Sequence, residues 1–197
     1  MTKVILKNAL ITVAMLVAAA LIVFSGGLLI SPQSMASACE NTGNYAFAVT
    51  CADLRYKRTK NVDDLARCAQ DSILSGKDKL IVKYCTMLVN DEGFESLCQT
   101  KDEYMASTEY GEYAAGYNRY IYTNLSVAQY HTGNLNQAID SAKSGKSFSK
   151  LVVAIIEKQD VEAAKEVVDA IDESNQELDK NNQDLFDLLQ QLITKGV

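Results

Sequence analysis

The stretch of sequence that decides the fold is residues 122–139, YTNLSVAQYHTGNLNQAI. It starts with apolar residues at helical spacing, passes through Gly133 and Asn134, and continues into a second segment of helical character. Gly and Asn are typical of the end of one helix or the N-cap of the next. We therefore expect two antiparallel helices joined by a short turn, which together form a helical hairpin.

The same turn pattern occurs at four places in the chain. Each copy reads as a turn residue, an apolar residue, a polar residue, any residue, and a small or apolar residue. The copies start at Asn61, Gly93, Asn134 and Asp160, at intervals of 32, 41 and 26 residues. These intervals are near the length of a helix-turn-helix repeat, so the pattern predicts about four linked hairpins.

The composition also favours helices. Of the 197 residues, 48% are apolar, and the single proline is Pro32, so the chain after residue 38 contains no proline. Sheet proteins depend on frequent Gly and Pro turns and on β-branched alternation, which the sequence does not show. The net charge of −6 disfavours a nucleic-acid-binding protein. The expected fold class is all-α.

Residues 122–139 resemble a tetratricopeptide repeat, in which an aromatic residue, a Leu and a small residue of the first helix pack against an Ala of the second. The resemblance covers one repeat well and residues 45–170 loosely, and it departs from the family at Ser126, where Gly is usual. It implies an irregular tetratricopeptide-like array of antiparallel hairpins, an α-solenoid, with a groove along its first helices. An irregular helical bundle with chance local similarity is the alternative. The matching residues are Tyr122, Leu125, Ser126, Gly133, Ala138 and Gly145.

The N-terminal segment has the features of an export signal. Lys3 and Lys7 precede an uncharged run over residues 9–30, which at helical rise is just long enough to cross a bilayer. Neither Lys nor Arg follows until Arg55, so we expect the rest of the chain in the periplasm or another extracytoplasmic compartment. The small residues at 36–38 suit cleavage by a signal peptidase. Cleavage to a soluble protein, cleavage with lipid attachment, and a retained membrane anchor are all open.

The positions of the cysteines predict disulfide bonds between helices. Residues 36–39 resemble a bacterial lipobox, which implies a lipid on Cys39 and leaves four cysteines to pair. Residues equidistant from a hairpin turn face each other, and two cysteine pairs have their midpoints just before the turns at positions 61 and 93. We therefore predict disulfides Cys51–Cys68 and Cys85–Cys98. The alternative pairs Cys68 with Cys85 and Cys51 with Cys98.

A tyrosine stripe is the candidate protein-binding surface. Tyr110, Tyr113, Tyr117 and Tyr120 follow one another at steps of three and four, which on one helix makes a continuous stripe. Packing of this stripe into the hairpin core is the plainer interpretation, because tyrosine suits positions where its ring contacts apolar groups and its hydroxyl contacts water. The functional interpretation is that the stripe forms a surface that binds peptides. Its candidate residues are Tyr110, Tyr113, Tyr117, Asn118, Arg119 and Tyr120.

The C-terminal region is acidic and leucine-rich. The residues from Leu151 to Ile156 are expected to form the first helix of a fourth hairpin, with Val161–Ile171 as the second. Ile171, Leu178, Leu185 and Leu192 then recur every seven residues, which predicts either a capping helix or a coiled-coil dimer. The expected domains are a signal peptide or membrane anchor (1–38), a repeat domain (39–171) and a capping or coiled-coil helix (172–197).

No catalytic or metal-binding motif is found. The chain contains no Gly-x-Ser-x-Gly, no His-Glu-x-x-His and no Cys-x-x-Cys, and its single His131 is expected at the surface. We therefore expect no enzyme activity and no cofactor. The expected function is a noncatalytic protein-binding scaffold or assembly factor at the bacterial cell envelope, whose partner is another envelope protein or peptide segment. A structural envelope subunit that self-associates into a homo-oligomer is the alternative.

Overall fold

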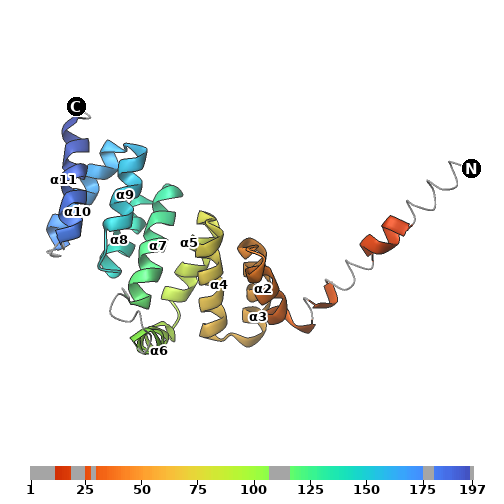
Figure 1. Cartoon of the computed structure of the whole chain (residues 1–197). Coiled ribbons are helices and arrows are strands. Elements are labelled where there is room, and N and C mark those ends of the chain that lie inside the picture. The colour runs from red at the N-terminus through yellow and green to blue at the C-terminus, as the bar shows by residue number, and fades with distance from the viewer. Residues whose placement is uncertain (1–11, 19–24, 28–29, 107–115, 175–179, 196–197) are drawn as a thin grey trace, which may run out of the picture. The chain divides into compact units, whose positions relative to one another are not determined.

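The computed structural model of the chain describes residues 12–18, 25–27, 30–106, 116–174 and 180–195. Within these residues the secondary structure is helical and contains no strand, which confirms the all-α prediction. Figure 1 labels the helices along the chain. The chain divides into two compact units, residues 1–71 and 72–197. The boundary between them lies inside helix α4 (Val62–Ser75).

The first unit is built on a hairpin of α2 (Pro32–Asn41) and α3 (Tyr45–Thr59), which pack against each other. Pro32 is tolerated in the first turn of α2, because the N–H that proline lacks would have no hydrogen-bond partner within the helix at that position. The chain reverses at Gly43, whose φ of 73° is a left-handed conformation that favours glycine. Asn44 then caps α3 with its side-chain oxygen. The sequence patterns do not predict this hairpin, because the small residues at 36–39 match a cleavage site.

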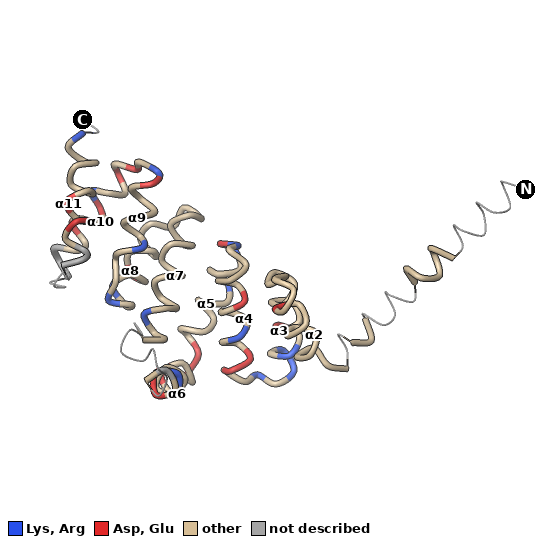
Figure 2. Tube along the Cα trace, viewed as in Figure 1, with Lys and Arg blue, Asp and Glu red and all other residues tan. Residues whose placement is uncertain are grey.

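Charges at the helix ends stabilise the junction between α3 and α4. Lys57 and Arg58 lie in the last turn of α3, and Asp63 and Asp64 lie in the first turn of α4 (Figure 2). Each pair has the sign that complements the dipole of its own helix. Lys60, with a left-handed φ of 53°, ends α3 between them.

The second unit begins inside α4, and its described residues form seven further helices, α5 to α11. The four helix starts predicted from the turn pattern are confirmed, because α4, α6, α8 and α10 each begin one residue after the expected turn residue. The helices are α5 (Asp78–Val89), α6 (Phe94–Ala106), α7 (Tyr117–His131), α8 (Leu135–Ser144), α9 (Ser149–Lys158), α10 (Val161–Ser174) and α11 (Lys180–Lys195).

Successive helices of the second unit pack on one another. Helix α7 forms a hairpin with α8 and also contacts α5, α6 and α9, and α9 in turn contacts α10 and α11. The packed array is compatible with a tetratricopeptide-like repeat fold. A continuous apolar core runs through α7 to α11 and includes the fully buried Leu151, Ile155 and Val167.

Small residues let α7 and α8 approach closely. Ser126 is 1% exposed, and its hydroxyl donates a hydrogen bond of 2.7 Å to the carbonyl of Ala138. At Gly145 an added Cβ would lie 2.7 Å from the Cβ of Tyr122, so only glycine fits there. These contacts join the positions of the α7–α8 hairpin that match the tetratricopeptide pattern.

The C-terminal leucines pack inside the chain. Ile171 is buried on α10, whereas Leu185 and Leu192 lie on α11, and the two helices pack against each other. Ile171 and the leucines of α11 therefore lie on two helices that pack side by side. Leu189 of α11 is fully buried against the core, and Leu178 lies outside the described residues. Whether the C-terminal segment is a capping helix or a coiled-coil helix stays a prediction.

Half of the N-terminal run expected to cross a membrane, residues 9–11, 19–24 and 28–29, lies outside the described residues. Among the residues that the structure describes, no helix is both long and apolar enough to span a bilayer. Residues 35–39, which contain the expected cleavage site, lie within α2, where Ala36 is fully buried.

Candidate functional site

The tyrosine stripe does not lie on one continuous helix, which corrects the prediction. Helix α7 begins at Tyr117, and Gly116 before it has a φ of 78° and a ψ of 145°, outside the helical region. The stripe is therefore interrupted at position 116. Tyr110 and Tyr113 lie outside the described residues.

The described residues of the stripe lie at the start of α7, and most are engaged with neighbours. The rings of Tyr117 and Tyr120 lie 6.3 Å apart between centroids, and both residues are half-buried. Arg119 donates a hydrogen bond of 3.3 Å to the hydroxyl of Ser147, whereas Asn118 is exposed. The contacts favour packing over binding for this part of the stripe.

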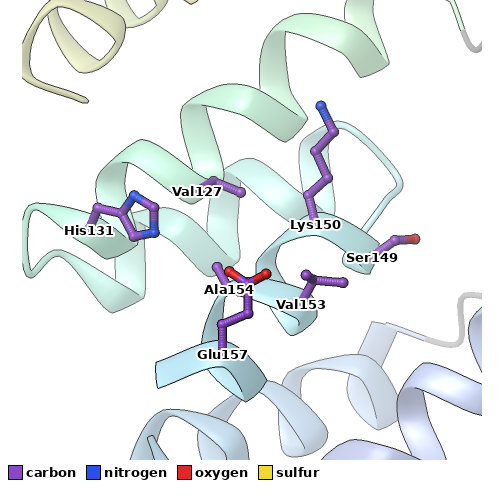
Figure 3. Close-up of a pocket in the computed structure, with 7 residues that line it drawn as sticks. All are labelled: Val127, His131, Ser149, Lys150, Val153, Ala154 and Glu157. Carbon is purple, nitrogen blue, oxygen red and sulfur yellow. The ribbon is translucent and has the colours of Figure 1, made fainter. Parts of the chain in front are cut away.

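A groove between α7 and α9 is the strongest candidate for a binding site in the described residues. It is a pocket of about 300 Å³, and its side chains come from the second half of α7 and from the length of α9 (Figure 3). We call it the α7–α9 groove. Its lining residues are Val127, His131, Ser149, Lys150, Val153, Ala154 and Glu157.

The α7–α9 groove combines an apolar centre with charged ends. Val127, Val153 and Ala154 provide the apolar surface, and Val153 is 38% exposed although it is a large apolar residue. Lys150 and Glu157 lie two helical turns apart on α9 and have opposite charge (Figure 3). The ammonium group of Lys150 donates a hydrogen bond of 3.2 Å to the side-chain oxygen of Asn124, which orients the lysine.

His131 separates this groove from a second, more polar pocket. It is exposed, as the sequence predicts, and its Nδ1 lies 3.3 Å from a carboxylate oxygen of Asp78. The second pocket measures about 370 Å³ and includes Tyr130, whose hydroxyl donates a hydrogen bond of 3.0 Å to Asp160. Burial, together with that bond, raises the pKa of Tyr130 to about 12, and Lys158 lies 4.6 Å from its ring centroid. These contacts fix the edge of the groove.

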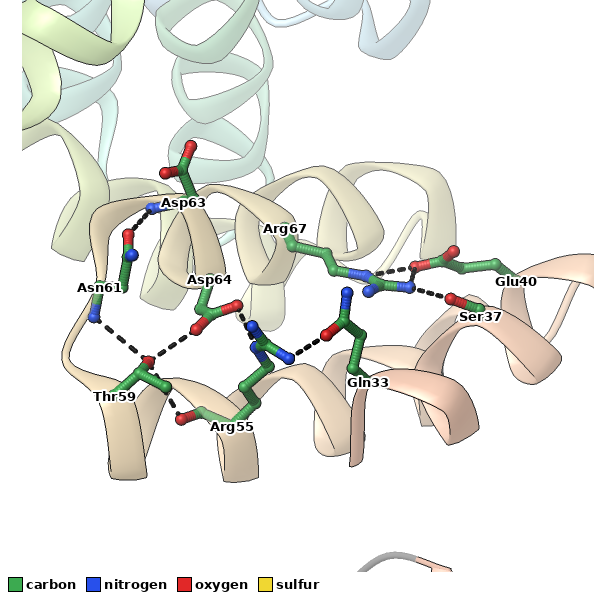
Figure 4. A network of polar contacts seen from close by, with 9 residues as sticks. All are labelled: Gln33, Ser37, Glu40, Arg55, Thr59, Asn61, Asp63, Asp64 and Arg67. Carbon is green, nitrogen blue, oxygen red and sulfur yellow. Dashed lines mark hydrogen bonds and ion pairs between the residues drawn. The ribbon is translucent and has the colours of Figure 1, made fainter. Parts of the chain in front are cut away.

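A polar network in the first unit joins α2, α3 and α4. Arg67 donates hydrogen bonds of 2.7 Å to Glu40 and 2.8 Å to Ser37 (Figure 4). Arg55 donates one of 2.6 Å to Asp64 and another to Gln33. The network ties the residues that precede Cys39 to the rest of the unit, and the sequence patterns gave no sign of it.

A buried carboxyl group adjoins this network. Asp71 is 2% exposed, and burial, with the neighbouring Glu40 as a second cause, raises its pKa to about 7. Arg67 lowers the pKa of Asp71 but does not cancel the rise caused by burial and Glu40. Asp71 therefore stays protonated over part of the pH range in which an exposed aspartate is charged.

The five cysteines are free thiols in the structure, so neither predicted disulfide is formed there. Burial raises the pKa of Cys68 to about 12, and the charged groups that act on it are the carboxylates of Asp53, Asp71 and Asp64. Burial raises the pKa of Cys51 to about 11, with the neighbouring Cys39 as the next cause. Burial raises the pKa of Cys85 to about 12 and that of Cys98 to about 11, and their pairing stays a prediction.

Comparison with known proteins adds no identity. A scan against protein-family models, a search of curated proteins and a search of solved structures each find no match. The described residues contain no group of three or more His, Cys, Asp or Glu side chains placed to hold a metal ion.

Proposed function

We propose that this chain is a noncatalytic scaffold that binds an extended segment of another protein in the α7–α9 groove. The observation that carries the proposal is the groove itself, with apolar side chains at its centre and Lys150 and Glu157 two turns apart on one helix. Binding surfaces for proteins combine an apolar centre with a polar rim. The expected ligand therefore has an apolar anchor flanked by an acidic and a basic side chain.

The order of the helices supports this proposal. Helices α7 and α9 are the first helices of two successive hairpins, and their contact forms the groove. Repeat arrays present the first helices of successive hairpins along one continuous binding face. The tetratricopeptide resemblance of residues 122–139 implies the same use of this face.

The size of the groove sets the kind of ligand. A volume of about 300 Å³ is at the low end for sites that enclose a small molecule, and this groove is open. It has room for one or two anchoring side chains, as in a short segment of a larger partner. We expect modest affinity for an isolated peptide and tighter binding for a partner that touches further hairpins.

We further propose that the scaffold is held at the bacterial envelope by an N-terminal segment that is not cleaved at Cys39. Ala36 is buried, Ser37 accepts a hydrogen bond from Arg67, and Gln33 accepts one from Arg55. Cleavage before Cys39 would remove all three residues and leave only the last turn of α2. If the N-terminal segment is retained, the first hairpin stays intact. Cys39 then lacks the free α-amino group that lipoprotein processing creates.

A peptide-binding experiment tests the groove. The full-length protein in detergent micelles is used to select from a displayed peptide library, and enriched peptides are measured by fluorescence anisotropy. We expect Val153→Asp to weaken binding at least tenfold, about 1.4 kcal/mol, because it places a charge in the apolar centre. Gln137→Glu, an exposed change on α8 outside the groove, should leave the affinity unchanged. Failure to enrich any peptide, or equal affinity in both variants, would overturn the proposal.

The alternative of a self-associating subunit has less support. Leu185 and Leu192, the two leucines of the seven-residue repeat that lie in the described part of the chain, pack on the core of α7 to α11. Leu188 is exposed on α11, and a single apolar side chain is a normal surface feature.

A further inference from the structure

Two hairpins of this chain, one in each unit, share the same turn. Thr42-Gly43-Asn44 joins α2 to α3, and Thr132-Gly133-Asn134 joins α7 to α8. Both glycines have positive φ, 73° and 86°. In each turn the threonine hydroxyl donates a hydrogen bond to a carbonyl of the preceding helix. Thr42 donates to Cys39 and Thr132 donates to Ala128, each at 2.9 Å.

The backbone hydrogen bonds of the two turns also correspond. The N–H of Asn44 donates to the carbonyl of Cys39 at 2.8 Å, and the N–H of Asn134 donates to that of Gln129 at 2.9 Å. The first hairpin is therefore a copy of the second, displaced by ninety positions. This equivalence lets contacts in one hairpin be compared with contacts in the other.

The comparison places a cysteine pair at a known point of contact. In the second hairpin, the hydroxyl of Ser141 donates a hydrogen bond of 2.7 Å to the side-chain oxygen of Gln129, across α7 and α8. Ninety positions earlier these residues are Cys51 and Cys39. Helices α2 and α3 pack against each other, and Cys39 is among the groups that raise the pKa of Cys51, so the two thiols lie near each other. The repeated turn, the packing of the two helices and the effect of Cys39 on Cys51 therefore all pair the same cysteines.

We infer that Cys39 and Cys51 form a disulfide that links α2 to α3 when the chain meets a disulfide-bearing oxidant. Cys51 is fully buried and Cys39 is only partly buried, so the oxidant reaches Cys39 first. This pairing differs from the predicted Cys51–Cys68 bond. The carboxylates of Asp53, Asp71 and Asp64 act on the thiol of Cys68.

The chemistry is a two-step thiol–disulfide exchange. The Cys39 thiolate attacks one sulfur of the oxidant, which forms a mixed disulfide and releases the first thiolate of the oxidant. The Cys51 thiolate then attacks the Cys39 sulfur, the new S–S bond forms, and the second thiolate leaves. The cysteine pair loses two electrons and two protons, and the oxidant gains them as two thiols.

The structure makes the second step the slow one. Burial raises the pKa of the Cys51 thiol to about 11, so a small fraction is thiolate near neutral pH. We expect a transient mixed disulfide on Cys39 that resolves faster as the pH rises. Export to an oxidising compartment would supply such an oxidant, but the test below does not depend on where the protein is located or on the groove.

Peptide mapping gives a direct test because cleavage after Lys, Arg and Glu places each of the five cysteines on its own peptide. The full-length protein in detergent is equilibrated with oxidised and reduced glutathione, alkylated, unfolded and digested without reduction. We expect peptide 8–40 joined to peptide 41–55, and a fall in free thiols from five to three. Peptide 41–55 joined to 68–77, or five alkylated thiols in the oxidised sample, would overturn the inference.

Variants separate the pair from the other cysteines. Cys68→Ser should leave the 8–40 to 41–55 linkage unchanged, and Cys39→Ser should abolish it. The double variant Cys39→Gln with Cys51→Ser copies the Gln129–Ser141 hydrogen bond and keeps the hairpin without its sulfur atoms. It should fold, as judged by circular dichroism, and lose no thiol on oxidation. A loss of two thiols in this double variant would show that other cysteines react and would contradict the assignment.

Discussion

Replacing Gly145 by Ala perturbs one defined contact between α7 and α8. The added Cβ would lie 2.7 Å from the Cβ of Tyr122 and 3.4 Å from the carbonyl oxygen of Ser141. A tyrosine Cβ is fixed to the backbone, so no side-chain rotation relieves the clash. The two helices must instead move apart along a core that includes Ser126 and Ala138.

The magnitude follows from two opposing effects. Overpacking of a close contact costs about 1–3 kcal/mol. The φ of Gly145 is −80°, which alanine adopts freely. Alanine also lowers the conformational entropy of the unfolded chain, which stabilises the folded protein by about 0.4–1 kcal/mol. We expect a net loss of about 1–2 kcal/mol in the free energy of unfolding. For a chain of this size, that lowers the melting temperature by about 2–8 °C.

The assay is thermal unfolding of the full-length protein, followed by circular dichroism, with amide hydrogen exchange to locate the loss. Ser144→Ala is the matched control, because it changes an exposed neighbour on the same helix and should stay within about 0.5 kcal/mol. Exchange in Gly145→Ala should accelerate in α7 and α8. A variant as stable as the Ser144 control would refute the close-packing argument.

Two further predictions concern a buried acid and a turn. Because the native pKa of Asp71 is raised from 3.8 to about 7, its contribution to stability is present below about pH 4 and is lost as the pH rises through 7. Asp71→Asn should therefore be more stable than the natural protein at pH 8, by on the order of 2 kcal/mol, with the difference absent at pH 4 in chemical denaturation. Gly133→Ala forces alanine to a φ of 86° and should cost about 1 kcal/mol in the same assay, although its Cβ meets no neighbour.

The sequence predicted the helix starts well because the signals for them are local. Asn61, Gly93, Asn134 and Asp160 each stand immediately before a helix, where turn and capping chemistry acts over a few residues. It failed for the stripe at residues 110–120, because helical spacing alone does not show that Gly116 leaves the helical region.

The first hairpin was missed for a different reason. Residues 36–39 match a cleavage site in composition, and small residues serve equally well where two helices approach closely. The repeated Thr-Gly-Asn at 42–44 and 132–134 was the available signal. The α7–α9 groove and the proximity of Cys39 to Cys51 depend on packing between separate helices, so the spacing of residues along one helix could not reveal them.

The most direct test of the central claim is site-specific photocrosslinking from the α7–α9 groove in cells. A photoreactive amino acid replaces Val153 in one strain and Gln137, exposed on α8, in another. We predict a discrete adduct with a different protein from position 153 only, and its loss when Lys150→Glu is added. Equal labelling from both positions, no adduct from position 153, or an adduct with a second copy of this chain would contradict a polypeptide-binding groove.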